Sequence, residues 1–272
     1  MFSKFQLTGI TSYDFPEYEY CGRSYFKKYQ SEIQMSLQDF IDENGVINGT
    51  KLQNDWFPVE TKFDVFLSHS HDDENTAIAL AGFLKKELNL NTFIDSCLWG
   101  YSNDLLWQLD KKYCRHSNGT SFDYNKRNYS TSHVHMMLSI ALSNMIDECE
   151  SVFFLNTPQS ISLKDDINKE QTSSPWIYNE LSIANMIRVR CIEDYRHQYA
   201  FLEHKDGVFA NESAGLTVKY AVNDALQDFL PLTADELKIC ARNWKNNRNS
   251  FQNALDYIYL SKGIISRYIL AD

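Results

Sequence analysis

The segment SSPWIYNELSI, residues 173–183, places one acidic side chain in a largely apolar stretch. Ser174 suits an N-cap and Pro175 suits the first helical position, so the segment predicts a helix that begins at Pro175. Trp176 and Glu180 then lie four residues apart on one face of this helix. A carboxylate beside an indole loses hydration, which would raise its pKa. A surface glutamate early in a helix has the same spacing, so the spacing alone leaves both interpretations open.

The segment SHSHDD, residues 68–73, gathers hydroxyl, imidazole and carboxylate groups directly after an apolar run. If that run is a parallel strand, the segment lies at the carboxyl edge of the sheet, where α/β proteins bind ligands. Ser68, His69 and Ser70 are therefore candidate ligand contacts. The alternative is a polar turn whose acidic residues open a helix.

The loop DSCLWGYSN, residues 95–103, follows a second predicted strand and reaches the same edge. Asp95 opens this loop, and Trp99 stands before Gly100, which puts a large flat side chain on a flexible backbone. Such a ring could stack on a nucleobase or contact a partner protein. A tryptophan folded back onto the core is the alternative.

Two His-x-His pairs, His69/His71 and His133/His135, raise the question of a metal site. Both histidines of such a pair face one way in an extended segment, but they diverge by about 200° on a helix. The second pair falls at a predicted helix start, and a metal site needs several ligands, so we expect no metal. His133 alone, near the crevice, is a candidate polar contact. The sequence contains no G-x-G-x-x-G, G-x-x-x-x-G-K-[ST] or G-x-S-x-G motif.

The elements that must position these residues are predicted from hydrophobic periodicity. Short apolar runs predict strands at 63–67, 91–95 and 151–156, and helical spacing predicts helices at 74–88, 104–113, 132–150 and 175–189. Strands that alternate with helices predict an α/β fold with a parallel sheet and helices on both faces.

The flanking regions are less regular. We predict an N-terminal extension over 1–60 with a helix at 25–43, an α/β domain over 61–230 with an insertion near 114–132, and a C-terminal helical extension over 231–272. Weaker strand signals occur at 207–210 and 216–222. The spacing of TADE, residues 233–236, is typical of a capping box.

The composition limits the class of protein. The 272 residues are 43% hydrophobic, enough to bury a sizeable core. A formal net charge of −10 argues against a general nucleic-acid binder, and it leaves open a local basic spot at Lys111, Lys112 and Arg115. We expect no membrane partner, because the sequence has neither a signal-peptide core nor an apolar run of about 18 residues. Six scattered cysteines without C-x-x-C favour free thiols in a reducing, cytoplasmic compartment.

Four segments in chain order, FDVFLSHSHDD, NTFIDSCLWG, SVFFLN and SSPWIYNEL, resemble the signature of a TIR domain. The chain is similar to standalone bacterial TIR-like proteins of antiphage defence, including the TIR component of Thoeris-type systems, over residues 62–190. The resemblance implies a flavodoxin-like sheet and cleavage of NAD⁺ at the nicotinamide–ribose bond. Glu180 matches the catalytic glutamate of the family pattern S-x-W-x-x-x-E-L. NAD⁺ would be a substrate, and we expect neither a cofactor nor a metal.

The resemblance also implies roles for the two loops. Residues 68–73 and 95–103 match loops that flank the nucleotide in the family. The second loop builds contacts between subunits in several members, so we expect self-association through it. With the crevice argument, the expected substrate contacts are Ser68, His69, Ser70, Asp95, Trp99, His133 and Trp176. The family assigns no fixed role to the histidines of SHSH.

The expected chemistry follows from the bond that breaks. Loss of nicotinamide leaves an oxocarbenium-like ribose, which a nearby carboxylate stabilises. Its capture by water gives ADP-ribose, whereas capture by a base nitrogen of the same nucleotide gives a cyclic isomer. We expect a cyclic or otherwise modified ADP-ribose that activates a downstream effector. The alternatives are a non-catalytic TIR-type scaffold, which needs no carboxylate at position 180, and a nucleoside-processing enzyme on a similar sheet.

Overall fold

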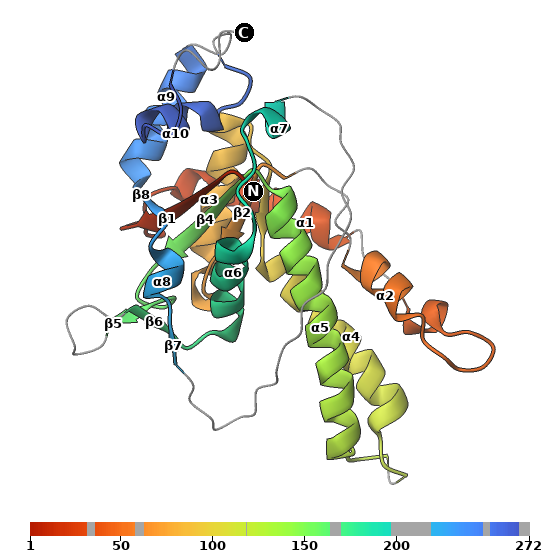
Figure 1. Ribbon diagram of the computed structural model, residues 1–272. Coiled ribbons are helices and arrows are strands. Elements are labelled where there is room, and N and C mark those ends of the chain that lie inside the picture. The colour runs from red at the N-terminus through yellow and green to blue at the C-terminus, as the bar shows by residue number, and fades with distance from the viewer. Residues whose placement is uncertain are drawn as a thin grey trace.

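A five-stranded, all-parallel sheet lies at the centre of the protein, with helices on both faces (Figure 1). The structure, a computed structural model, describes residues 1–31, 36–57, 63–117, 119–163, 170–196, 219–246 and 251–266. The strands of the central sheet are β1 (Ser3–Thr8), β2 (Val65–Ser68), β3 (Thr92–Ile94), β4 (Ser151–Asn156) and β8 (Leu230–Leu232). The fold is α/β and flavodoxin-like, as the sequence predicts.

The helices vary widely in length. The α-helices are α1 (Glu19–Ser31), α2 (Gly49–Trp56), α3 (Glu74–Leu88), α4 (Ser96–Leu109), α5 (Tyr124–Glu148), α6 (Pro175–Met186), α7 (Glu193–Arg196), α8 (Asn223–Leu226), α9 (Ala234–Asn246) and α10 (Leu255–Ser261). Single turns of other kinds are the 3₁₀ helices η1 (Pro16–Tyr18), η2 (Leu37–Phe40) and η3 (His71–Asp73), and the π-helix η4 (Asp110–Cys114). A small antiparallel sheet joins β5 (Ser162–Leu163), β6 (Glu170–Thr172) and β7 (Tyr220–Ala221).

The two faces of the sheet bury separate hydrophobic cores. In β2, Val65 and Leu67 face a core shared with α1, α3, α9 and α10, whereas Phe66 faces a core shared with α2, α4, α5 and α6. This alternation follows from the period of two in a strand. Strands that are buried on both faces read as nearly continuous apolar runs, which is why β2 and β4 are visible in the sequence.

Helices α1 and α3 approach each other backbone to backbone through two glycines. A Cβ atom at Gly22 would come within 1.9 Å of the Ile78 carbonyl oxygen, and one at Gly82 within 2.2 Å of the Tyr18 carbonyl oxygen. Neither position can hold a side chain without moving one helix, so this contact depends on glycine at both positions.

The prediction for 1–60 is wrong in two respects. The helix predicted at 25–43 corresponds to α1, which ends at Ser31, and to the separate 3₁₀ turn η2 with Ser36 extended before it. The first residues of the segment belong to the central sheet. Strand β1 lies between β4 and β8, parallel to both. Lys4 and Gln6 interrupt the apolar residues of this strand, so it lacks the continuous run by which β2 and β4 are recognised. Phe5 and Leu7 alternate with them and enter the core, and this period of two is the signal for the strand.

The predictions for 95–103 and 114–132 are also wrong. Helix α4 begins at Ser96, where a loop is predicted, and Asp95 is its N-cap: a side-chain oxygen accepts a hydrogen bond from the Ser96 N–H. Helix α5 begins at Tyr124, within the predicted insertion, with Asp123 as N-cap. Most of residues 124–133 are exposed to solvent. This part of the helix therefore carries no apolar stripe from which it could be recognised.

The predicted C-terminal helices are confirmed, but the predicted boundary at 231 falls within β8, a strand of the central sheet that was not predicted. Helices α9 and α10 are present, and the capping box is formed: Thr233 N–H donates to Glu236 Oε2 at 2.9 Å and Glu236 N–H donates to Thr233 Oγ1 at 3.3 Å. The predicted strand at 207–210 lies outside the described residues, as do 216–218. The rest of the weak signal at 216–222 corresponds to β7, which pairs with β6 outside the central sheet.

Candidate functional site

The strand order reverses direction beside β2, which lies between β3 and β4. The chain steps from β2 to β3 on one side and then crosses back to β4 on the other. Such a reversal is the usual position of a ligand crevice, at the carboxyl ends of the strands. Ser68 ends β2 and His69 follows it, while Asp95 follows β3. Three of the expected contact residues are thus placed at this edge by the sheet itself.

Helix α6 brings Glu180 to the same edge. Its start is fixed as the sequence predicts: Ser174 Oγ accepts a hydrogen bond from the Ile177 N–H at 3.3 Å, and Pro175 is the first helical residue. Glu180 lies in the second turn and is 1% exposed. The Ser68 hydroxyl donates to Glu180 Oε2 at 2.6 Å. The glutamate is therefore a buried side chain tied to the end of β2, and the surface interpretation is wrong.

Asp95 and His69 complete this cluster. Both are fully buried, and His69 Nδ1 lies 2.5 Å from Asp95 Oδ1. The backbone N–H groups of His69 and Ser96 donate to the two oxygens of the same carboxyl group, at 3.3 and 2.7 Å. Asp95 thus links the end of β2 to the start of α4.

The carboxyl groups of Asp95 and Glu180 share one buried site, and the charge of either disfavours ionisation of the other, so the pair holds one proton between them. Burial raises the pKa of Glu180 well above its ordinary value, and the charge of Asp95 raises it further, against the lowering effect of the Ser68 hydroxyl. Burial also raises the pKa of Asp95, opposed by the N–H groups of His69 and Ser96. The two side chains therefore behave as a coupled pair that shares a proton.

His69 does not supply a positive charge to this pair. Burial lowers its pKa to about 4, although the charges of Glu180, Glu74 and Asp73 act in the opposite direction. At neutral pH the imidazole is therefore uncharged and one ring nitrogen carries the proton. The cluster of Ser68, His69, Asp95 and Glu180, which we call the acid pair site, is a buried polar site with an acidic character.

The other expected contact residues lie around or outside this site. Trp176, four residues before Glu180, is partly buried, and its ring packs edge-on against His135 with centroids 5.3 Å apart. Ser70 precedes η3 and is partly buried. Trp99 lies in the first turns of α4, and its side chain lies outside the described part of the structure.

His133 is not brought to the acid pair site. It is exposed on α5, where it packs edge-on against Tyr129 with ring centroids 4.5 Å apart. Residues two apart on a helix diverge by about 200°, so His135 rather than His133 meets α6. The expected contact of His133 with the crevice is therefore not formed, because its side chain lies on an exposed part of α5.

Thr157 and Asp73 form a further polar link at this edge that the sequence reasoning missed. The Thr157 hydroxyl, just after β4, donates to Asp73 Oδ2 at 2.5 Å. Burial raises the pKa of Asp73, and the hydroxyl lowers it. Thr157 follows SVFFLN directly, so the rule that ligands bind beyond the carboxyl ends of strands was a sufficient signal for it.

Comparisons with known proteins do not assign the chain to a family: no family model, no curated protein and no solved structure matches it. Among the described residues, no group of three or more His, Cys, Asp or Glu side chains is arranged to hold a metal ion. No helix in the described ranges combines the length and apolar character needed to cross a bilayer. The fold and the site therefore define a flavodoxin-like α/β protein with a buried acid pair at the carboxyl edge of its sheet.

Proposed function

We propose that this protein is a TIR-type NAD⁺ glycohydrolase or ADP-ribosyl cyclase, with Glu180 as its catalytic residue. Its product, a cyclic or otherwise modified ADP-ribose, would serve as a signal in bacterial antiphage immunity. The observation that carries the proposal is the position of Glu180, buried at the carboxyl edge between Ser68 and Asp95, with a raised pKa. Strongly perturbed carboxyl groups at such an edge are typical of catalytic sites.

The proposed chemistry uses the negative charge of Glu180. When the bond between nicotinamide and ribose breaks, positive charge develops on the anomeric carbon and ring oxygen. An ionised Glu180 close to that carbon would stabilise this charge more than it stabilises the neutral sugar of the substrate. Movement of the shared proton onto Asp95 leaves Glu180 ionised. Trp176, on the same helix face, would restrict the access of water to the cation.

The substrate can reach Glu180 only after a rearrangement. Ser68, His69, Asp95 and Glu180 are all 0–1% exposed. Asp95 is the N-cap of α4, so movement of this helix start is the simplest way to uncover the pair. The family resemblance gives segment 95–103 a role in self-association. Assembly through this segment would therefore couple opening of the site to oligomer formation, and turnover would rise with protein concentration.

The complete burial of Glu180 also favours a second candidate, a non-catalytic TIR-type scaffold. In such a scaffold the hydrogen bond from Ser68 to Glu180 would have a purely structural role, because it joins α6 to β2. A scaffold of this kind would act through its surface and would bind partner proteins without turnover of NAD⁺.

The decisive experiment compares NAD⁺ turnover by wild type, Glu180→Gln and Glu17→Gln at high protein concentration. Glu17 is an exposed glutamate of η1 and serves as the matched control. Nicotinamide release and the ribose product are resolved by liquid chromatography and mass spectrometry. We expect Glu180→Gln to lose roughly 10²–10³-fold in rate, because an ionised group aimed at the developing charge is removed. Glu17→Gln should match wild type.

Equal turnover by wild type and Glu180→Gln would contradict the catalytic role. If wild type releases no nicotinamide over a range of concentrations, with and without lysate of infected cells, the scaffold is favoured. Turnover of deoxynucleosides with NAD⁺ untouched would indicate a nucleoside-processing enzyme. Circular dichroism of each variant separates loss of chemistry from loss of fold.

A further inference from the structure

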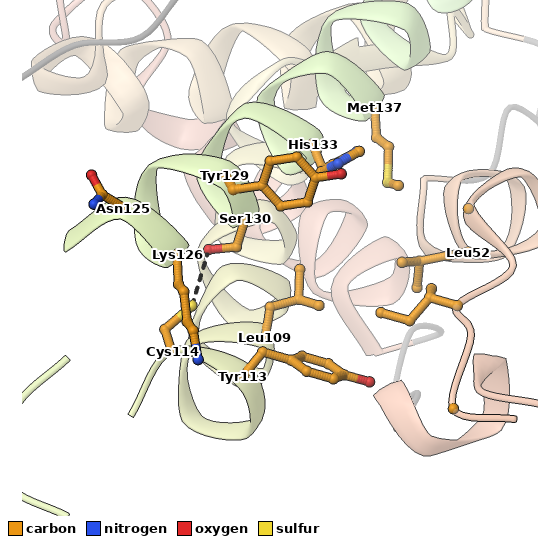
Figure 2. A pocket seen from close by; sticks show the side chains of 13 residues that line it. Leu52, Leu109, Tyr113, Cys114, Asn125, Lys126, Tyr129, Ser130, His133 and Met137 are labelled. Atoms are coloured by element: carbon orange, nitrogen blue, oxygen red, sulfur yellow. Dashed lines mark hydrogen bonds between the residues drawn. The ribbon is translucent and has the colours of Figure 1, made fainter. Parts of the chain in front are cut away.

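A cavity of about 750 Å³ lies between the α4–α5 helix pair and the segment that leads into α2 (Figure 2). It shares no residue with the acid pair site. In Figure 1 the two long helices project beyond the sheet, and the cavity lies along this projecting part. Its volume falls within the range of roughly 300–1,000 Å³ that is usual for small-molecule sites.

The wall of the cavity is mainly apolar. Ile47 and Leu52 contribute from the α2 side, and Leu109 and Met137 from the helix pair. Figure 2 shows the side chain of Tyr113 pointing from the helix pair toward the side from which Leu52 projects. A ligand would therefore place an apolar or aromatic body between these side chains.

The charge of the lining has one sign. Lys126 carries a permanent positive charge, and the His133 ring packs against Tyr129 without entering this charge balance. None of the described residues that line the cavity is acidic. The nearby carboxylate of Asp110 is already bonded, since it accepts from Arg127 Nε at 2.7 Å and from Ser130 Oγ at 2.8 Å. In a chain of net charge −10, a lysine in a lining without acidic residues favours an anion over a cation.

We propose that the cavity binds a small amphipathic anion, with an apolar body and a single acidic headgroup such as a carboxylate. The body would contact Leu52, Leu109 and Met137, and the headgroup would lie at Lys126. Nucleotides fit less well, because one permanent cation in a mainly apolar lining does not match several phosphate charges. In this proposal His133 lines the cavity beside the body of the ligand, away from the acid pair site, and the proposal does not depend on turnover of NAD⁺.

The test measures binding of dodecanoate, below its micellar concentration, by isothermal titration calorimetry. Dodecyltrimethylammonium has the same tail with the opposite charge. The main variant is Lys126→Glu, and the matched control is Lys27→Glu, which changes an exposed lysine of α1 in the same way. Lys126 is the third residue of α5, where glutamate is a favoured residue, so the fold should be retained. Met137→Trp fills the cavity without a change of charge.

Wild type and Lys27→Glu should bind dodecanoate at least about tenfold more tightly than the cation, because the tail is common and only the headgroup differs. Lys126→Glu should lose this preference, and Met137→Trp should weaken binding of both compounds. The proposal is wrong if neither compound binds, if both bind equally to wild type, or if the two lysine variants behave alike. Tighter binding of adenosine monophosphate than of dodecanoate would also overturn it in favour of a nucleotide site.

Discussion

The protein buries a pair of acidic side chains at each edge of its central sheet. One pair contacts a buried cation, and the other contacts only uncharged groups. At the amino edge, Arg196 donates to Glu150 Oε2 at 2.7 Å and to Asp256 Oδ1 at 2.5 Å, and the Tyr259 hydroxyl donates to Glu150 at 2.9 Å. At the carboxyl edge, the described partners of Asp95 and Glu180 are a hydroxyl, an uncharged imidazole and backbone N–H groups.

This difference lies in the charge of the groups that contact each pair. Burial alone would lower the pKa of Arg196, but its bonds to Glu150 and Asp256 hold it above the ordinary value, so the guanidinium is a fixed cation. It joins α7 and α10 to the residue that precedes β4. The acid pair site has no such cation among its described partners. Its stability falls as the pH rises, because the folded pair retains a proton that the unfolded chain releases. Proteins retain such uncompensated groups mainly where chemistry requires them.

The largest expected effect tests the amino edge. Arg196→Met leaves two buried carboxyl groups without their cation, which should lower the free energy of unfolding by roughly 3–5 kcal/mol. Urea denaturation followed by circular dichroism measures this change. Arg23→Met is the matched control, because Arg23 pairs with Glu19 on the surface of α1 and should cost less than about 1 kcal/mol. A loss at Arg196 no larger than at Arg23 would remove the contrast between the two edges.

A smaller effect of opposite sign is expected at the carboxyl edge. The pKa of Glu180 is raised in the folded state, so the folded protein holds a proton that the unfolded chain releases. Stability is therefore greatest below the unfolded pKa and falls as the pH rises toward the folded one. Glu180→Gln removes this loss and supplies an amide donor toward Asp95. We expect a gain of roughly 1–3 kcal/mol at pH 8 that shrinks toward pH 4.

Denaturant titrations of wild type and Glu180→Gln across this pH range provide the measurement. A gain that is constant with pH would show that packing rather than ionisation is responsible. Destabilisation at pH 8 would mean that the pair is already compensated, and the comparison of the two edges would then be wrong.

The smallest effect sharpens the description of the acid pair. The charge of Asp95 is one cause of the raised pKa of Glu180, second to burial, so Asp95→Asn should move that pKa to lower pH. Nuclear magnetic resonance of ¹³C-labelled glutamate carboxyl groups measures it without any need for activity. If the protein cleaves NAD⁺ with an ionised Glu180, the acidic limb of its pH–rate profile should shift in the same direction. An unchanged titration would show that the two carboxyl groups are not coupled.

Much of the fold could be predicted because several of its central strands are short apolar runs flanked by polar, turn-forming residues. FDVFL and SVFFLN are visible as β2 and β4, since both faces of these strands are buried. Strand β1 was not predicted, because its polar residues at 4 and 6 hide its alternation. The early part of α5 was missed for a related reason: its surface is solvated, so no hydrophobic stripe marks it.

The candidate site divides in the same way. Ser174 and Pro175 determine where α6 begins, and the position of Glu180 on the helix follows from that start. Whether this glutamate faces solvent or the end of β2 depends on how α6 packs, which no local spacing encodes. His133 and His135 illustrate the limit, since only the packing of α5 on α6 shows that His135 contacts Trp176 while His133 stays exposed.

The sequence by itself determined the local elements, namely the buried strands, the caps of α6 and α9 and the polar residues that follow each strand. These features depend on neighbours a few residues apart, where propensity and hydrogen-bonding geometry act directly. Only the tertiary structure decided that Asp95 and Glu180 meet, that Arg196 neutralises the other edge and that β1 enters the middle of the sheet. Such contacts join residues far apart in the chain, and their pKa shifts come from burial that exists only once the helices have packed on the sheet.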